Sequence, residues 1–162
     1  MIDLDDNTED AATRRARIVA QRRLDTGIDE AMIERLVRTF YGRVRQHPVL
    51  GPIFDARIVD WEDHMHRLMA FWSSVVLASG AYGGTPMQKH LPLPVDGRHF
   101  DAWLRLFAET VRDICPEAQA ALFMERALRI AESLELAIAG EHGVFLAKGE
   151  RLSRPDTDVF FP

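Results

Sequence analysis

Apolar residues recur at three- and four-residue spacing through most of the chain, which is the pattern of amphipathic helices. The pattern predicts four main helices, over residues 28–46, 60–79, 97–114 and 117–140. The inward face of the first consists of Ile33, Leu36, Val37, Phe40, Tyr41 and Val44. Nothing alternates at period two for more than a few residues, so no strand is expected. The predicted fold class is all-α.

Capping and breaking residues set the limits of these helices. Asp29 and Asp60 are placed to cap the first two, and Pro48 ends the first because proline disfavours helical geometry in the residue before it. Pro116 lies where proline is tolerated, in the first turn of the last helix. Between the first two helices, V-L-G-P-I-F is interpreted as an apolar turn that is too short to form an element. Its buried side chains are predicted to be Leu50, Ile53 and Phe54.

The two ends of the chain lack the helical pattern of the middle. The first 27 residues have few apolar anchors and are rich in arginine between Arg14 and Arg23, which predicts a charged, partly helical extension. The tail has no period and ends in F-F-P; we expect it to be poorly ordered or to lie on the surface, where the aromatic pair could dock in a groove. The predicted organisation is an extension at 1–27, one domain at 28–148 and a tail at 149–162.

Composition narrows the class of protein. The 162 residues are 47% hydrophobic and 28% charged, as in an ordinary globular domain. The formal charge of -5 provides no basic footprint, so nucleic acid is an unexpected partner. No apolar run is long enough to span a bilayer, and the acidic start does not resemble a secretory signal. Cys115 is the only cysteine, which excludes an internal disulfide and favours a cytoplasmic location.

Histidine is the residue type that best indicates chemistry here, and several kinds of site are excluded first. There is no H-E-x-x-H, no pair of carboxylate-x-x-His motifs and no cysteine–histidine cluster, which argues against a zincin or a di-iron bundle. Nor is there a glycine-rich phosphate loop or a G-x-S-x-G elbow. His64 and His66 are two residues apart, so on a helix they face apart and cannot chelate one metal. His47, His66 and His142 are assigned to the surface or to ordinary hydrogen bonds.

Four other side chains remain. His90 lies just before a break formed by Pro92 and Pro94, and the helix that follows is rich in aromatic residues. Three further residues place polar groups on apolar helical faces: Tyr41, His64 and Trp103. Buried polar groups of this kind need partners. They are either unrelated core residues or one cluster at the end of an apolar cavity.

Several motifs together resemble the truncated haemoglobins, most closely the group numbered three. They are F-Y-G-R-V-R (40–45), L-G-P-I-F (50–54), W-E-D-H (61–64), F-W-S-S-V-V-L (71–77), Y-G-G-T-P (82–86), K-H-L-P-L-P (89–94) and H-F-D-A-W-L-R-L-F (99–107). The resemblance covers about residues 28 to 140, in order and with the expected spacing. It implies a truncated globin fold, a two-over-two helical sandwich that encloses haem b.

The resemblance also implies roles for single residues. His90 would be the proximal ligand of the iron, with its other ring nitrogen donating to a backbone carbonyl or water. Phe54 would pack against the porphyrin. Without a C-x-x-C-H motif the haem would be held non-covalently. The walls of the haem cavity would be Leu68, Phe71 and Trp72. Arg67 and Lys89 would meet the haem propionates, or else be exposed without contacting haem.

On the distal side, Tyr41, His64 and Trp103 match the positions that surround bound ligand in the family. Donors aimed at a ligand that gains negative charge act as an electrostatic clamp, which slows its loss. We therefore expect binding of dioxygen, nitric oxide, carbon monoxide or peroxide, used in redox chemistry rather than oxygen storage. Because the chain has no flavin or nicotinamide fingerprint, electrons would come from a separate reductase. The alternatives are a haem-based sensor acting through the N-terminal arm or C-terminal tail, and a helical bundle without haem.

Overall fold

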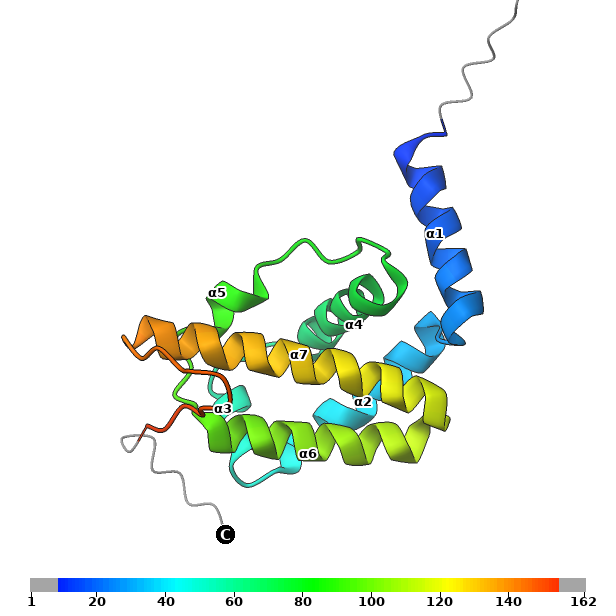
Figure 1. Cartoon of the computed structure of the whole chain (residues 1–162). Coiled ribbons are helices and arrows are strands. Elements are labelled where there is room, and N and C mark those ends of the chain that lie inside the picture. Colours follow the sequence, from blue (N-terminus) through cyan, green and yellow to red (C-terminus); the bar gives the residue numbers. More distant parts are fainter. Residues whose placement is uncertain (1–8, 155–162) are drawn as a thin grey trace, which may run out of the picture.

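The computed structural model describes residues 9–154, and within this range the chain forms seven helices and no strand (Figure 1). They are α1 (Ala11–Thr26), α2 (Glu30–Gln46), α3 (Leu50–Asp55), α4 (Trp61–Leu77), α5 (Pro86–His90), α6 (Gly97–Ile114) and α7 (Glu117–Glu141). The four long helices of the body, α2, α4, α6 and α7, lie within a few residues of the predicted ranges. The all-α prediction is confirmed.

The body is built from two pairs of helices. Helix α2 packs on α4, α6 packs on α7, and α2 also packs on α6, which joins the two pairs into the expected two-over-two sandwich. The predicted caps hold: the Asp29 carboxylate accepts a hydrogen bond from the Met32 N–H at 2.8 Å, and that of Asp60 accepts one from the Asp63 N–H at 3.0 Å. Each cap satisfies an amide that the first turn of its helix leaves without a partner.

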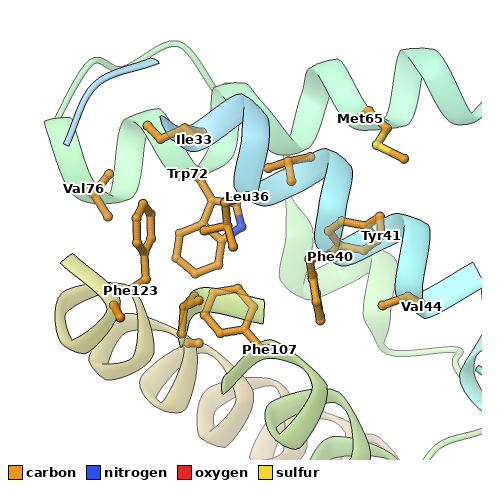
Figure 2. Packing of buried hydrophobic residues seen from close by; sticks show 14 of the residues in the cluster. Ile33, Leu36, Phe40, Tyr41, Val44, Met65, Trp72, Val76, Phe107 and Phe123 are labelled. Carbon is orange, nitrogen blue, oxygen red and sulfur yellow. The ribbon is translucent and has the colours of Figure 1, made fainter. Parts of the chain in front are cut away.

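Large aromatic side chains fill the space between the helix pairs, as Figure 2 shows. We call the buried group that they form with the surrounding aliphatic residues the main cluster. Phe107 is fully buried and stacks on Trp72 on one side and on Trp103 on the other, with ring centroids 5.4 and 5.3 Å apart. Phe40 meets the edges of Trp103 and Phe107 at 5.2 and 5.1 Å. Contacts of this kind fix the relative positions of α2, α4 and α6.

The prediction of a mere turn at residues 49–54 was wrong, because Leu50–Asp55 form the short helix α3. Its amide groups are satisfied from outside: Nδ1 of His47 accepts hydrogen bonds from the N–H groups of Val49 and Leu50 at 3.2 and 3.1 Å. Gly51 lets α3 lie close to α2, since a Cβ there would stand 2.6 Å from the backbone oxygen of Arg45. Pro52 falls in the first turn, where a missing N–H costs nothing.

Helix α1 extends beyond the body (Figure 1) and contains no buried residue, but it packs on α4 and places Val19 against the main cluster. It ends at Gly27, whose φ of 71° is the left-handed conformation that glycine adopts most easily at a helix end. Asp10 caps its start by accepting from the Thr13 N–H at 2.7 Å. No helix within residues 9–154 is long and apolar enough to cross a membrane.

The prediction that the tail lies on the surface holds for most of residues 149–154, which are exposed or half-buried, but it was wrong at Leu152. Leu152 is only 3% exposed and belongs to a second, smaller buried group with Val95, Ile138 and Ala139, which we call the proximal cluster. Leu93 and Phe100 pack against it. The terminal F-F-P lies outside the described residues, so its predicted docking stays a prediction.

Candidate functional site

Tyr41, His64 and Trp103 come from α2, α4 and α6, and the fold brings them together; we call them the distal group. The ring of Tyr41, 5% exposed, lies 6.1 Å from that of His64 and meets it edge-on. The Trp103 side chain lies close enough to the Tyr41 phenol to act as its hydrogen-bond partner. One cluster, rather than three unrelated core residues, is therefore what the helices form.

The protonation of this group follows from its surroundings. Burial raises the pKa of the Tyr41 phenol, and the hydrogen bond with Trp103 opposes that rise without cancelling it. The phenol therefore keeps its proton at neutral pH. Since the Trp103 indole can only donate, the oxygen of Tyr41 is the acceptor in their bond, and its own O–H remains available as a donor.

His64 is half-buried on α4, beside the ring of Trp61 at 5.8 Å. Burial lowers the pKa of its imidazole, and the charges of Arg67 and His90 lower it further. His64 is therefore neutral near pH 7, with one N–H to donate. The influence of His90 also means that the two imidazoles lie within reach of each other's charge.

His90 is the last residue of α5, a helix that begins at Pro86 and contains no buried residue. Its ring is half-buried, and Nδ1 lies 2.5 Å from the carbonyl oxygen of Pro86 one turn earlier. A carbonyl can only accept, so Nδ1 carries the proton and Nε2 carries the free lone pair. Nε2 has no hydrogen-bond partner among the described residues. In the neutral imidazole, Nε2 is therefore the nitrogen that can bind a metal.

Phe54 of α3 approaches the distal group, with its ring 6.0 Å from that of Tyr41. It stacks with Trp61 at 6.4 Å, and Trp61 in turn donates from its indole N–H to Asp55 at 3.0 Å. Trp61 was not among the predicted site residues. Its position three residues before His64, on the same helical face, was the signal available in the sequence.

The three predicted wall residues of α4 lie in different surroundings. Leu68 and Phe71 are partly buried beside the main cluster, and the Phe71 ring meets that of Tyr82 at 5.5 Å. Trp72 is 2% exposed and packs inside the main cluster between Phe107 and Phe123. Phe107, which stacks on both Trp72 and Trp103, links it to the distal group.

Arg67 and Lys89 are exposed and border an open depression of about 390 Å³ between α4 and the α4–α5 loop. Arg67 also forms an ion pair with Asp63 at 2.7 Å. Tyr82 lines the same depression and was missed as a site residue. Gly84 permits the close approach of Tyr82, since a Cβ at position 84 would collide with the phenol. The depression combines two cations with an aromatic wall.

These residues fit a haem on the evidence of their own geometry. The bond of His90 Nδ1 to the carbonyl of Pro86 leaves Nε2 as the nitrogen that would bind the iron. Aromatic and aliphatic side chains of α3 and α4 supply apolar walls. Arg67 and Lys89 supply positive charge at the rim, where a carboxylate-bearing group would meet solvent.

Comparison with known proteins places the chain among globins. The model of the bacterial-like globin family matches residues 25–138. A group 3 truncated haemoglobin of Campylobacter jejuni is 34% identical over 113 residues, which is 67% of this chain and 89% of that protein. A group 2 truncated haemoglobin of Bacillus subtilis is 28% identical over 99 residues, covering 60% and 75%.

Solved structures of truncated haemoglobins are also similar to this chain. The crystal structure of the group III truncated haemoglobin from Campylobacter jejuni is similar with a TM-score of 0.64, at 31% identity and with 73% of this chain and 92% of that chain covered. A group II truncated haemoglobin from Bacillus anthracis shares the fold alone, with a TM-score of 0.60 at 24% identity.

Proposed function

Because the chain belongs to the bacterial-like globin family, we propose that it holds haem b through His90 and binds dioxygen or another small diatomic ligand beside Tyr41, His64 and Trp103. Membership in the family implies a haem cofactor and haem-based ligand binding in general. The assignment of individual residues, the type of haem and the use of the ligand are the proposal.

The observation that carries the proposal is the arrangement of donors. When bound, haem supplies an iron atom at which a diatomic ligand gains partial negative charge. His90 would hold the iron through Nε2, since Nδ1 donates to the carbonyl of Pro86. Arg67 and Lys89 would pair with the propionates. Phe54 would pack against the macrocycle beside the distal group.

Tyr41 is the principal donor to the ligand in this proposal. Trp103 donates to the Tyr41 oxygen, which orients the phenol and leaves its O–H free to point elsewhere. The raised pKa keeps that proton in place. His64, held neutral by burial, would be a second donor. Preorganised donors in a water-poor site stabilise developing charge without rearranging when the ligand arrives.

Slow release of oxygen favours redox use over storage. A net hydrogen bond contributes about 1 kcal/mol, and about 1.4 kcal/mol corresponds to tenfold in an equilibrium constant. Two good donors would therefore slow oxygen loss by roughly one to two orders of magnitude. A protein that retains oxygen so well delivers it poorly. We propose reaction of oxygen, nitric oxide or peroxide at the haem, with electrons from a separate reductase.

The test is the oxygen dissociation rate of Tyr41→Phe, measured by stopped flow on the ferrous oxygenated protein. We expect an increase of about tenfold, because the variant keeps the ring and loses only the donor. The matched control is Thr13→Val, which removes a hydroxyl group from an exposed residue of α1. An unchanged rate in Tyr41→Phe would remove Tyr41 from the proposed role.

A further inference from the structure

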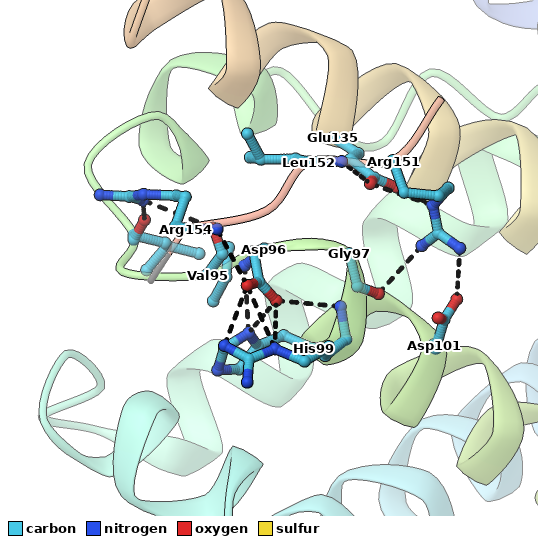
Figure 3. Close-up of polar contacts among 11 residues, drawn as sticks. Val95, Asp96, Gly97, His99, Asp101, Glu135, Arg151, Leu152 and Arg154 are labelled. Carbon is cyan, nitrogen blue, oxygen red and sulfur yellow. Dashed lines mark hydrogen bonds and ion pairs between the residues drawn. The ribbon is translucent and has the colours of Figure 1, made fainter. Parts of the chain in front are cut away.

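The segment 149–154, which we call the strap, crosses the junction between α5 and α6 (Figure 3). It lies beyond residue 138, where the match to the family model ends. Its backbone is tied to α6 and α7: the Gly97 N–H donates to the carbonyl of Leu152 at 2.8 Å, and the Leu152 N–H donates to the buried carboxylate of Glu135 at 2.9 Å. The strap is therefore part of the folded body.

Two arginines of the strap extend these ties. Arg151 binds the Glu135 carboxylate through Nε at 3.1 Å, donates to the carbonyl of Gly97 at 2.9 Å and forms an ion pair with Asp101 at 2.8 Å. Gly97 permits this approach, since a Cβ there would stand 3.0 Å from Glu135 and 3.2 Å from Leu152. One guanidinium thus joins the start of α6 to the end of α7.

The second arginine acts on the segment that follows His90. Arg154 donates from one nitrogen to the carbonyl of Leu93 at 3.1 Å and to that of Val95 at 3.4 Å. Leu93 is itself bound to the proximal residue, because its N–H donates to the carbonyl of His90 at 3.0 Å. A continuous path of hydrogen bonds therefore runs from the strap to the backbone of His90.

A buried carboxylate and an apolar contact also hold the segment that follows His90. The carboxylate of Asp96, 1% exposed, accepts from the N–H of Arg154 at 3.2 Å and from the guanidinium of Arg98 at 3.0 Å. Burial raises the pKa of this carboxyl, but these hydrogen bonds outweigh burial and the pKa is lowered overall. Leu152 closes the proximal cluster beside Val95.

Helix α5 lies against α7 but is short and shallowly packed. It spans five residues, none of them buried, and the loop before it contains Gly83 and Gly84. The upstream link of His90 is its own bond to Pro86, which lies within the same short helix. Beyond this packing on α7, the polar restraint from the rest of the body comes from the downstream side, through residues 93–97.

We propose that the strap positions His90, with Arg154 and Leu152 fixing the segment behind the imidazole so that Nε2 stays in place for the iron. The inference rests on the proposed role of His90 as axial ligand. Arg154 and Leu152 are positioning residues, since neither contacts the cofactor site. Without these two side chains, the imidazole can move away from the metal and rotate. Its bond to the metal is then weaker and varies more in geometry from molecule to molecule.

The test uses the full chain loaded with haem and compares Arg154→Ala and Leu152→Ala with two matched controls. Arg129→Ala removes an exposed arginine that pairs with Glu125 on α7, and Leu136→Ala removes a half-exposed leucine of the same helix. The first measurement is the iron–histidine stretching band of the ferrous protein by resonance Raman. The second is the rate of haem transfer to an excess of a haem-scavenging apoprotein.

For both strap variants we expect a shifted or broadened iron–histidine band and haem loss about tenfold faster than in the unmodified protein. The controls should match the unmodified protein. A lower melting temperature with an unchanged band and rate would reduce the strap to a stabilising element and overturn the proposal. Where Leu152→Ala fails to fold, Arg154→Ala decides, since it removes no buried apolar side chain. Absence of any iron–histidine band in the unmodified protein would instead refute His90 as ligand.

Discussion

The two sides of the candidate site are built in different ways. Tyr41, His64 and Trp103 stand on helices of 17 and 18 residues, and two of them pack directly against the main cluster. His90 stands on a helix of five residues without buried side chains. Its position depends on an irregular segment, the small proximal cluster and the strap. Helix packing defines one side, whereas loop and tail hydrogen bonds define the other.

The difference matters because the two kinds of support respond to different changes. A long packed helix moves only when the core is repacked, which involves many contacts at once. A short helix held by a few hydrogen bonds can move while the core stays intact. We therefore expect the positions of Tyr41, His64 and Trp103 to change only when global stability changes. The position of His90 is expected to change independently of global stability.

The largest expected effect follows from His90→Ala. Loss of the proposed axial nitrogen should abolish the Soret band of protein expressed with ample cofactor, while far-UV circular dichroism stays close to that of the unmodified protein, because His90 is not part of either buried cluster. His142→Ala, at an exposed residue that follows α7, is the control and should retain colour. Undiminished pigment with a histidine-ligated spectrum would contradict the assignment.

On the distal side, the largest effect is expected from a substitution in the main cluster. Phe107→Ala empties a fully buried position between Trp72 and Trp103, so the free energy of unfolding should fall by about 3–5 kcal/mol. Urea unfolding followed by tryptophan fluorescence measures this loss. Phe145→Ala, at a position 89% exposed, should change it by less than about 0.5 kcal/mol. Equal effects from the two variants would argue against the stack as the distal support.

The smallest effect concerns α3, the one short helix on the distal side. Nδ1 of His47 accepts from the amide of Val49, just before α3, and from that of Leu50, its first residue. Burial together with the charge of Arg105 lowers the pKa of His47. The unfolded chain then takes up the proton at higher pH than the folded protein. This contribution is complete above about pH 6.5 and is lost as pH falls through the lowered pKa.

His47→Ala should therefore cost about 1 kcal/mol at pH 7.5 and progressively less on acidification. Urea midpoints between pH 7.5 and 5.5 measure the difference between variant and unmodified protein, which separates His47 from His64 and His99, whose pKa values are also lowered. His142→Ala, on an exposed residue, is the control. If the difference in stability between the two proteins does not depend on pH, the protonation of His47 does not affect the stability that these two hydrogen bonds provide.

Sequence reasoning succeeded where periodicity decides structure. The spacing of apolar residues predicted the four long helices, and the caps at Asp29 and Asp60 followed from residue type. Tyr41, His64 and Trp103 could be recognised as polar residues on apolar faces. That they meet depends on the angles between three helices, which no single stretch of sequence encodes.

Sequence reasoning failed where side chains from distant segments supply the hydrogen-bond and packing partners. Helix α3 exists because His47 satisfies its first amides and Gly51 allows contact with α2, neither of which is a standard capping signal. The burial of Leu152 was missed because a single leucine has no period to reveal it. Its acceptor Glu135 lies 17 residues earlier, on another element. The proposed roles of the arm α1, the reductase and the terminal F-F-P stay predictions.

The position of the strap in the sequence has a consequence for the order of assembly during synthesis. Residues 149–154 leave the ribosome after all the helices of the globin body, so the nascent chain can form the distal aromatic stack before the partners of residues 93–97 exist. Domains generally acquire structure from the N-terminal side as they are made. A chain whose synthesis stops after α7 would have its main core complete, but His90 would lack the restraint that the strap provides.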